Sequence, residues 1–285
     1  MGRSFTKKSL VVEIILAEGD FGGGNTKTIE GLACEAVITK PGLPEKCGAQ
    51  VKIWGLPYDD LAELTTLAFE PMESARNLIS ISAGDEGGEK SRVFAGEIAS
   101  AWANFEAEPD VFLQIEAEAG FYPQRISAPP MSVNGEAPAA DLIAKQAAEM
   151  GYDFRNRGVS ASVRNAYFSG SPLEKAATIA DQVGAELIID DNEIILIPAG
   201  GSRGDEVPLL RKDTGMIGYP TFNQDGIVCR CFYRKDLELG GLIKVESIVP
   251  RASGTWKITK LDYHLSAYQP GGGPWECQIE GQNVG

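Results

Sequence analysis

Histidine and an excess of basic charge are what this sequence lacks most. Its 285 residues include one histidine, and 26 Lys and Arg stand against 40 Asp and Glu, so the formal net charge is −14. A protein that grips a phosphate backbone needs Lys and Arg to displace the condensed counterions. We therefore expect no specific nucleic-acid binding.

Long hydrophobic runs are also absent. No stretch approaches the ~18 apolar residues of a membrane-spanning helix, so we expect no membrane span. The apolar stretch near the N-terminus, residues 10–17, is interrupted by Glu13. It is also shorter than the hydrophobic core and cleavage site of a secretory signal. We therefore predict that this stretch is a β-strand.

The sequence contains few cysteines, and their number is odd. The five thiols of Cys34, Cys47, Cys229, Cys231 and Cys277 cannot all pair within one chain. They favour a reducing compartment in which the thiols are buried and inert. Glycine is abundant, with 33 residues. This abundance is typical of many tight turns, and hence of β-rich structure rather than a helical bundle.

The patterning divides the chain into three zones, and in the first, residues 1–127, strands alternate with turns. The predicted strands cover residues 10–17, 31–39, 50–54, 77–82, 92–102 and 110–117. One helix is predicted from Tyr58, with apolar residues at Leu61, Leu64, Leu67 and Ala68. Asp59 or Asp60 can cap it and Pro71 closes it. Strands with one short helix suggest a β-sandwich or a small barrel.

The middle zone, residues 128–200, has a different composition. Residues 137–151 predict a helix with Pro138 at its start and Gly151 after its end. A second helix is predicted from Pro172 to Val183, before Gly184. Two apolar runs, residues 185–189 and 193–197, then flank a turn of Asp and Asn and predict a hairpin. We interpret this zone as a small α+β module.

In the last zone, residues 201–285, the strand pattern returns. Residues 200–204 have the composition of a flexible linker, and Tyr219-Pro220 and residues 269–274 are predicted loops. The predicted strands cover residues 227–233, 242–249, 255–267 and 275–280. The predicted fold class is therefore mainly β with an α+β insertion.

The single histidine, His264, lies in a predicted strand beside two other polar residues. Strand alternation places Asp262, His264 and Ser266 on one face. Neighbours on one strand face lie about 7 Å apart, which is too far for a hydrogen-bonded catalytic relay. We interpret His264 as an ordinary, partly exposed histidine.

Four other patterns resemble functional motifs without completing them. Cys229 and Cys231 share a strand face, but a zinc site needs four suitably spaced ligands. Residues 22–28 lack the spacing of a phosphate loop, and residues 158–162 lack the last glycine of a nucleophile elbow. Residues 190–193 lack the EF-hand spacing and are interpreted as a solvated hairpin tip. We therefore expect no catalytic residue, no cofactor site and no metal site, and we do not expect an enzyme.

Several short patterns, in their order and spacing, resemble the central baseplate hub proteins of contractile-tailed phages and related injection machines. In the first zone they are residues 49–56, the helix at 60–67, and residues 93–98 and 109–115. In the last zone they are residues 237–245 and 254–264. The resemblance implies two tail-tube-like β-barrel domains, residues 1–127 and 201–285, separated by the α+β module.

The resemblance also implies a structural role in the virion. Hub proteins of this family form a homotrimeric ring that joins the sixfold tail tube to the threefold central spike and lets DNA pass during ejection. The implied partners are the tail tube protein, the spike protein, the tape-measure protein and baseplate wedge components. The ring would be assembled in the host cytoplasm. Any wall-degrading activity would belong to a partner.

A ring of this kind surrounds a channel, and we expect the channel wall to carry more acidic than basic side chains. Lys and Arg there would bind passing phosphates, whereas Asp and Glu repel them. Candidate acids on one strand face are Glu106, Glu108 and Asp110, or Glu116 and Glu118.

Two alternative functions remain open on the sequence alone. One is a tail-associated cell-wall glycan hydrolase, with Asp153 and Asp262 as acid and base. The other is a carbohydrate-binding tail-tip protein, in which Trp256, Trp275 or Tyr268 would form a flat platform. Trp256 and Trp275 fall within predicted strands, which favours packing in a core or an interface.

Overall fold

The computed structural model describes residues 6–17, 21, 24–65, 76–106, 108–123 and 128–284. Nearly half of these residues lie in strands, and the helices α1 (Tyr58–Thr65), α2 (Ala139–Met150) and α3 (Pro172–Gln182) are short. Within the described ranges, no helix has the length and apolar character needed to cross a membrane. The predicted mainly-β fold class is confirmed.

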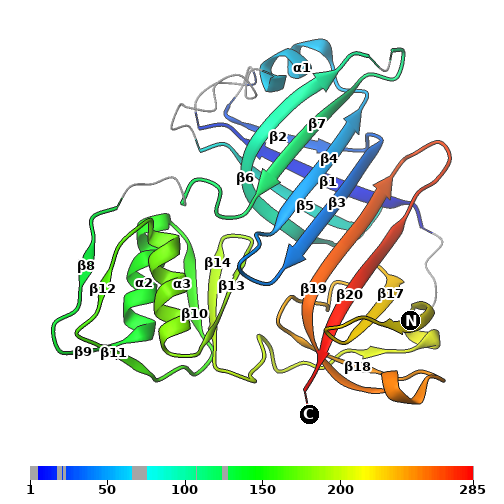
Figure 1. The fold of residues 1–285 in the computed structure, drawn as a ribbon. Coiled ribbons are helices and arrows are strands. Elements are labelled where there is room, and N and C mark those ends of the chain that lie inside the picture. The colour runs from blue at the N-terminus through cyan, green and yellow to red at the C-terminus, as the bar shows by residue number, and fades with distance from the viewer. Residues whose placement is uncertain are drawn as a thin grey trace.

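One large sheet contains strands from both ends of the chain (Figure 1). From the first zone come β1 (Lys8–Ile15), β2 (Thr26–Glu30), β3 (Cys34–Pro41), β4 (Gly48–Trp54), β5 (Leu78–Asp85), β6 (Lys90–Asn104) and β7 (Phe112–Glu118). From the last come β15 (Leu209–Leu210), β16 (Met216–Phe222), β17 (Ile227–Phe232), β18 (Leu242–Val245), β19 (Gly254–Ala267) and β20 (Trp275–Asn283). The order is β16-β17-β20-β19-β3-β4-β7-β6-β5-β1-β2, and β18 joins β15 to β19.

The pairing of β3 with β19 connects the first and last zones directly. These strands run antiparallel from Lys260 opposite Pro41 to Ala267 opposite Cys34. Residues more than two hundred positions apart in the sequence therefore lie side by side in one sheet. Whether each zone forms its own barrel, and whether the domains divide after residues 127 and 200, stay predictions.

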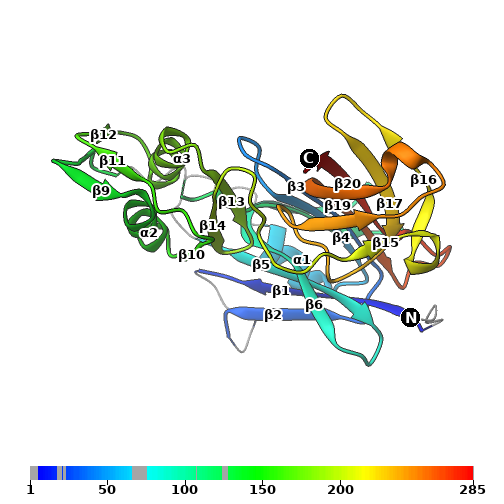
Figure 2. The ribbon, with the colours of Figure 1, turned by 90° about the horizontal axis from the view of Figure 1, so that it is seen from below.

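Alternating apolar and polar residues give the sheet two different faces. In β7, Leu113, Ile115 and Ala117 are buried, while the residues between them are half-exposed. Because successive strand side chains point to opposite faces, one face packs into the core and the other stays polar. The 15-residue strand β6 curves, and β5, β1 and β2 fold back across the core face (Figures 1 and 2).

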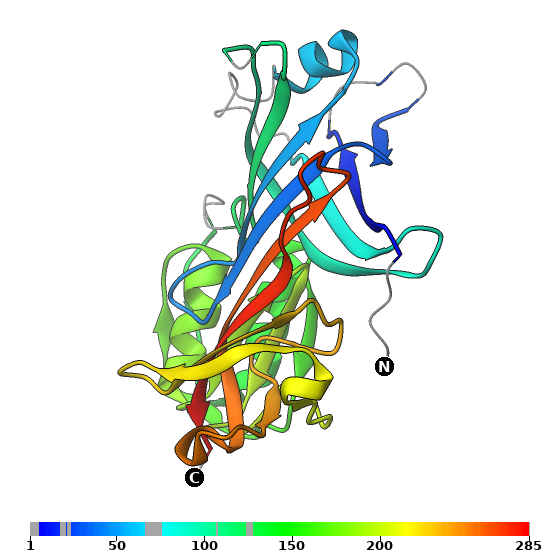
Figure 3. The same ribbon diagram turned by 90° about the vertical axis from the view of Figure 1, so that its right-hand side faces the viewer.

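The middle zone forms a separate α+β unit beside the large sheet. Its strands are β8 (Met131–Ser132), β9 (Glu136–Pro138), β10 (Asp153–Asn156), β11 (Ser162–Arg164), β12 (Tyr167–Phe168), β13 (Glu186–Asp190) and β14 (Glu193–Ile197). A small sheet has the order β10-β14-β13, and α2 and α3 pack together against it. The ribbons β9–β11 and β8–β12 extend outward (Figure 1). Figure 3 shows this unit and the C-terminus at the opposite end of the molecule from α1.

Local signals explain both helices of this unit. Gly151 ends α2 in the left-handed conformation, with φ of 72°, which glycine adopts without a steric penalty. At the start of α3, the Ser171 hydroxyl accepts a hydrogen bond from the Glu174 amide, and the Glu174 carboxylate accepts one from the Ser171 amide. This capping box satisfies amide groups that the helix itself leaves unpaired. Both predicted helices are confirmed.

Removing this cap is expected to destabilise α3 measurably. Ser171→Ala leaves the Glu174 amide without its acceptor and should lower the free energy of unfolding by about 1 kcal/mol. Urea denaturation followed by circular dichroism measures the change. The control is Ser160→Ala in an exposed loop, and equal losses for the two variants would contradict the assigned role of the cap.

One loop prediction is wrong. Tyr219 and Pro220 lie in β16, at an edge of the large sheet where the strand pairs with β17 alone. A proline lacks the amide proton that an inner strand requires, but an edge strand tolerates it. The predicted end of α1, with Leu67, Ala68 and Pro71, lies outside the described residues.

Candidate functional site

The register of the large sheet gathers polar side chains on its outer face, which we call the polar face. Asp262 lies opposite Gln278 on β20 and Thr39 on β3. His264, two residues further along β19, lies opposite Glu276 and Val37. Directly opposed residues point to the same face. The same face therefore continues across β17, β20, β19, β3, β4 and β7.

The charge of the polar face is negative. On these six strands its acids are Glu35, Glu116, Glu118, Asp262, Glu276 and Glu280, and its bases are Lys52, Arg230, Lys257 and Lys260. Two of the bases already pair within the face, Arg230 with Glu276 at 2.6 Å and Lys260 with Glu280 at 3.6 Å. A charged molecule close to this surface would therefore meet an excess of carboxylates.

A shallow groove of about 230 Å³ crosses the polar face beside His264. Arg230, Glu276 and Gln278 line it together with His264. Asp262 is buried next to this row, and burial raises the pKa of its carboxyl although Lys260 opposes the shift. His264 and Asp262 face different partners across the sheet. Ser266 is buried further along β19.

The proposed acid and base of a hydrolase, Asp153 and Asp262, belong to different sheets. Asp153 is exposed at the start of β10 in the α+β unit, whereas Asp262 lies within β19 of the large sheet. The platform aromatics are not assembled either. Trp256 is buried and donates a hydrogen bond to the Ala252 carbonyl, Trp275 packs on Tyr233, and the Tyr268 hydroxyl donates to Glu86. The expected packing of Trp256 is confirmed.

The cysteines lie on the core side of the sheet. Cys231 on β17 is directly opposite Cys277 on β20, and all five thiols are free and buried. Burial raises the pKa of Cys34, Cys47 and Cys229 to about 12. Within the described ranges, no three His, Cys, Asp or Glu side chains come together as metal ligands.

Thiols with such pKa values should not react at neutral pH, because the thiolate is the nucleophile. We expect the native protein to give almost no colour with Ellman's reagent over an hour at pH 7.5. The same sample in guanidinium chloride should release five equivalents, one per cysteine. Fast reaction of one or more thiols in the native protein would contradict this burial.

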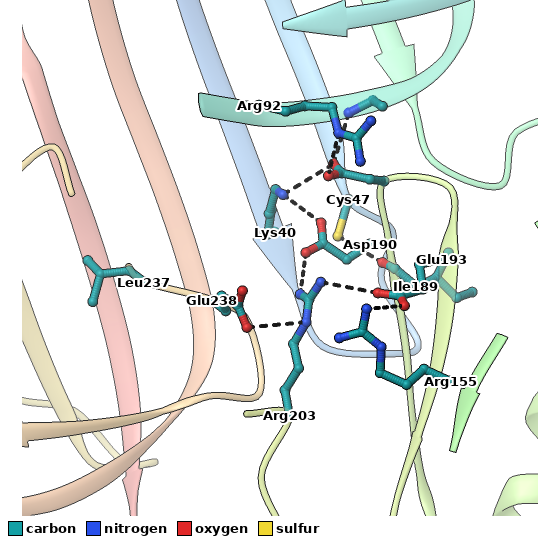
Figure 4. A network of polar contacts seen from close by, with 12 residues as sticks. Lys40, Cys47, Arg92, Arg155, Ile189, Asp190, Glu193, Arg203, Leu237 and Glu238 are labelled. Atoms are coloured by element: carbon teal, nitrogen blue, oxygen red, sulfur yellow. Dashed lines mark hydrogen bonds and ion pairs between the residues drawn. The ribbon is translucent and has the colours of Figure 1, made fainter. Parts of the chain in front are cut away.

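A buried ionic cluster fastens the α+β unit to the large sheet (Figure 4). Lys40 Nζ on β3 lies 2.5 Å from Asp190 Oδ1 at the end of β13, and Arg203 pairs with the other oxygen of the same carboxylate. Asp191 accepts a hydrogen bond from the Ala95 amide on β6 at 2.9 Å and lies 3.3 Å from Arg92. The two aspartates thus connect β13, β3, β6 and the segment after β14.

The electrostatics of the ionic cluster favour the charged states of Lys40, Asp190 and Arg203. Burial alone would raise the pKa of Asp190, but Lys40 and Arg203 outweigh it and hold that pKa below its ordinary value. Asp190 correspondingly raises the pKa of Lys40 and of Arg203 against the effect of their burial. Glu193 and Glu238 lie 3.7 and 3.6 Å from the Arg203 guanidinium.

Two expectations from the sequence are corrected here. Residues 190–193 are not a solvated hairpin tip, since Asp190 is only 4% exposed. Residues 200–204 are not a free linker, because the Arg203 side chain is buried in the cluster and its amide donates to the Gly240 carbonyl. The physical reason is that Lys40, 150 positions away, supplies the opposite charge.

A second buried carboxylate performs a similar role beside Tyr152, at the same end of the small sheet as Asp190. Glu97 on β6 is 0% exposed and accepts hydrogen bonds from Arg76, from the Tyr152 hydroxyl and from the Phe121 amide. Tyr152 follows Gly151, the residue that ends α2, and Arg76 also donates to the carbonyl of Met150, the last residue of α2. The α+β unit is therefore held to the sheet at two points.

The structure places most of the remaining sequence candidates in strands and turns. Gly22 and Gly23 lie outside the described residues, and residues 26–28 belong to β2, as expected for a strand after that loop. Residues 158–161 connect β10 to β11, and the Asn156 side chain accepts hydrogen bonds from the Gly158 and Val159 amides there. Glu116 and Glu118 are on the polar face, but Glu106, Glu108 and Asp110 lie in the turn between β6 and β7 rather than on a strand.

This arrangement, a large sheet shared by both ends of the chain with an inserted α+β unit, can be compared with known proteins. A family model described as Baseplate hub gp41 matches residues 11–269. The chain belongs to this baseplate hub family. Membership makes it a structural component of a phage tail, and hence of the virion. No curated protein sequence matches the chain.

Solved structures share the fold of this hub protein at low sequence identity. A tail protein from Neisseria meningitidis MC58 has a TM-score of 0.65 at 12% identity and covers 96% of both chains. A 43 kDa tail protein of prophage MuSo2 from Shewanella oneidensis has a TM-score of 0.64 at 11% identity. The match covers 97% of this chain and 98% of that protein. An E. coli type VI secretion component, described as similar to T4 tail proteins gp27 and gp5, has a TM-score of 0.57 at 9% identity. The match covers 88% of this chain and 73% of that protein.

Proposed function

We propose that three copies of the chain form a closed ring in the baseplate of a contractile tail. The observation that carries this is the division of the sheet at the β3–β19 pair. On one side of the pair the strands are β3, β4, β7, β6, β5, β1 and β2, and on the other β19, β20, β17 and β16, with β18 and β15 attached to β19. Each copy thus offers two β-rich halves, and three copies offer six. A threefold ring then matches a sixfold tail tube on one side and a threefold spike on the other.

In this ring the polar face lines the channel. The core face is already covered by β5, β1 and β2, which leaves the polar face for the lumen. Its excess of carboxylates would repel the phosphates of DNA and let the duplex pass without binding. A cyclic arrangement uses heterologous contacts that close on themselves, so no strand edge stays open to aggregation.

The ring has a structural role and no enzymatic one. Its proposed partners are the tail tube protein, the central spike protein, the tape-measure protein and wedge components. Assembly takes place in the host cytoplasm, where reduced thiols such as those of this chain are stable. Activity on the cell wall belongs to another tail protein.

Native mass spectrometry tests the ring. The protein is co-expressed with the spike protein of the same virus, and the complex is purified through a tag on the spike. We expect three copies of this chain for every three spike chains. A complex with one, two or four copies per spike trimer would overturn the proposal.

A further inference from the structure

Two exposed aromatic rings lie at the end of the molecule that carries α1. Tyr58, at the start of α1, is 70% exposed, and Phe105, after β6, is 46% exposed. Their rings stack with centroids 6.3 Å apart and planes inclined by 7°. Trp54 and Phe112, whose rings are 5.3 Å apart, occupy the ends of the adjoining strands on the polar face. Together these four rings form what we call the aromatic tip.

Acids surround the exposed part of the aromatic tip. Asp59 follows Tyr58, and Glu106, Glu108 and Asp110 follow Phe105, all with exposed side chains. The nearby lysines already have partners. Lys27 lies 2.8 Å from Asp60, and Lys52 sits over the Phe112 ring at 5.4 Å. The surface that a partner would meet is therefore apolar at its centre and negative at its rim.

We infer that the aromatic tip docks a partner protein that presents an apolar pocket bordered by Lys or Arg. Exposed stacked aromatics surrounded by charge are typical of the central anchors of protein interfaces. A second copy of this chain fits poorly, since its net charge of −14 would set acid against acid. The partner is thus a different tail protein with a basic rim.

The position of the aromatic tip indicates an axial neighbour of the ring. Figures 1 and 3 show α1 at the opposite end from the α+β unit and the C-terminus. Trp54 and Phe112 belong to the polar face, so this inference rests on the proposed function, in which that face lines the channel. The partner would then sit at the mouth of the channel, at the end away from the α+β unit.

Site-specific photo-crosslinking in assembled tails tests this inference. A benzoylphenylalanine at position 58 is expected to form an adduct with another tail protein, at a segment that combines apolar residues with Lys or Arg. The control places the same group at Tyr167, which is 65% exposed on β12 of the α+β unit. Adducts only between copies of this chain, or no more adduct than at position 167, would overturn the inference.

Substitution tests the same surface with the partner that the adduct identifies. Tyr58→Ala combined with Phe105→Ala should weaken binding by about 30-fold, as expected for a central aromatic anchor. Asp59→Lys combined with Glu106→Lys should also weaken it and reduce its dependence on salt. Trimer formation with the spike is measured on the same variants. Trimers that bind the partner normally would overturn the docking inference alone, whereas failure of the unmodified chain to form trimers would overturn the proposed ring.

Discussion

Asp190→Asn is expected to lower the free energy of unfolding by about 3–5 kcal/mol, the cost of leaving buried charges without their partner. The substitution keeps the shape of the side chain but removes the negative charge between Lys40 and Arg203, whose side chains are 6% and 10% exposed. Urea denaturation at pH 7 measures the loss. The matched control is Asp205→Asn, which removes an exposed carboxylate that pairs with Arg157. This control should change the stability by at most about 1 kcal/mol.

Comparing the native protein with Asp190→Asn at different pH values tests the same ion pairs, and the direction of the expected change is fixed. The pKa of Asp190 is lower in the folded protein than in the unfolded chain. Its stabilising effect is therefore complete above the unfolded value of about 3.9 and is lost as the pH falls through the folded value. The stability difference between the native protein and Asp190→Asn should be constant from pH 7 to pH 5 and shrink below pH 4. A difference that disappears between pH 7 and pH 5 would contradict the assigned ion pairs.

Reversing the charge of the polar face should turn a surface that repels DNA into one that binds it. Replacing Glu116, Glu118, Glu276 and Glu280 by lysine adds cations on β7 and β20 of the proposed channel wall. We expect the variant ring to bind duplex DNA with a dissociation constant of roughly 10⁻⁴–10⁻⁶ M at physiological salt, and more weakly as salt rises. Fluorescence anisotropy measures this, and DNA ejection from variant particles should slow.

The control for that experiment reverses the same number of charges elsewhere. Glu149, Asp181, Glu206 and Asp213 are exposed and lie outside the large sheet. Their replacement by lysine changes the net charge equally and should leave ejection unaffected. Equal inhibition of ejection by both sets would show that total charge matters rather than the polar face, and would contradict the assignment of this face to the channel.

Most elements of the fold could be predicted from local patterns. Alternation in residues 110–117 predicts β7, and Pro172 with Gly184 brackets α3. Each of these signals lies within a single helix or strand and depends only on residues of that element. The edge strand at Tyr219 is predicted as a loop because proline is typical of turns, and β7 is predicted to begin at Asp110 although it begins at Phe112.

The ionic cluster could not be predicted in the same way. Asp190 and Asp191 have the composition of a solvated turn, and only their contact with Lys40 and Arg203 makes them structural. That contact depends on the pairing of β3 with β19 and on where the α+β unit packs. The polar face likewise needs the register across strands from both ends of the chain, although the acids of β7 already indicate it. Which distant strands pair, and in which register, cannot be predicted from the local pattern of a single sequence.

Cryo-electron microscopy of the assembled baseplate tests the central claim most directly. The reconstruction should contain three copies of this chain around the tail axis, with Glu116, Asp262 and Glu276 on the channel wall and the core face turned away. The lumen at this level should carry more acidic than basic side chains. Two-, four- or fivefold symmetry at this protein, or a channel wall built from another face of the sheet, would contradict the account.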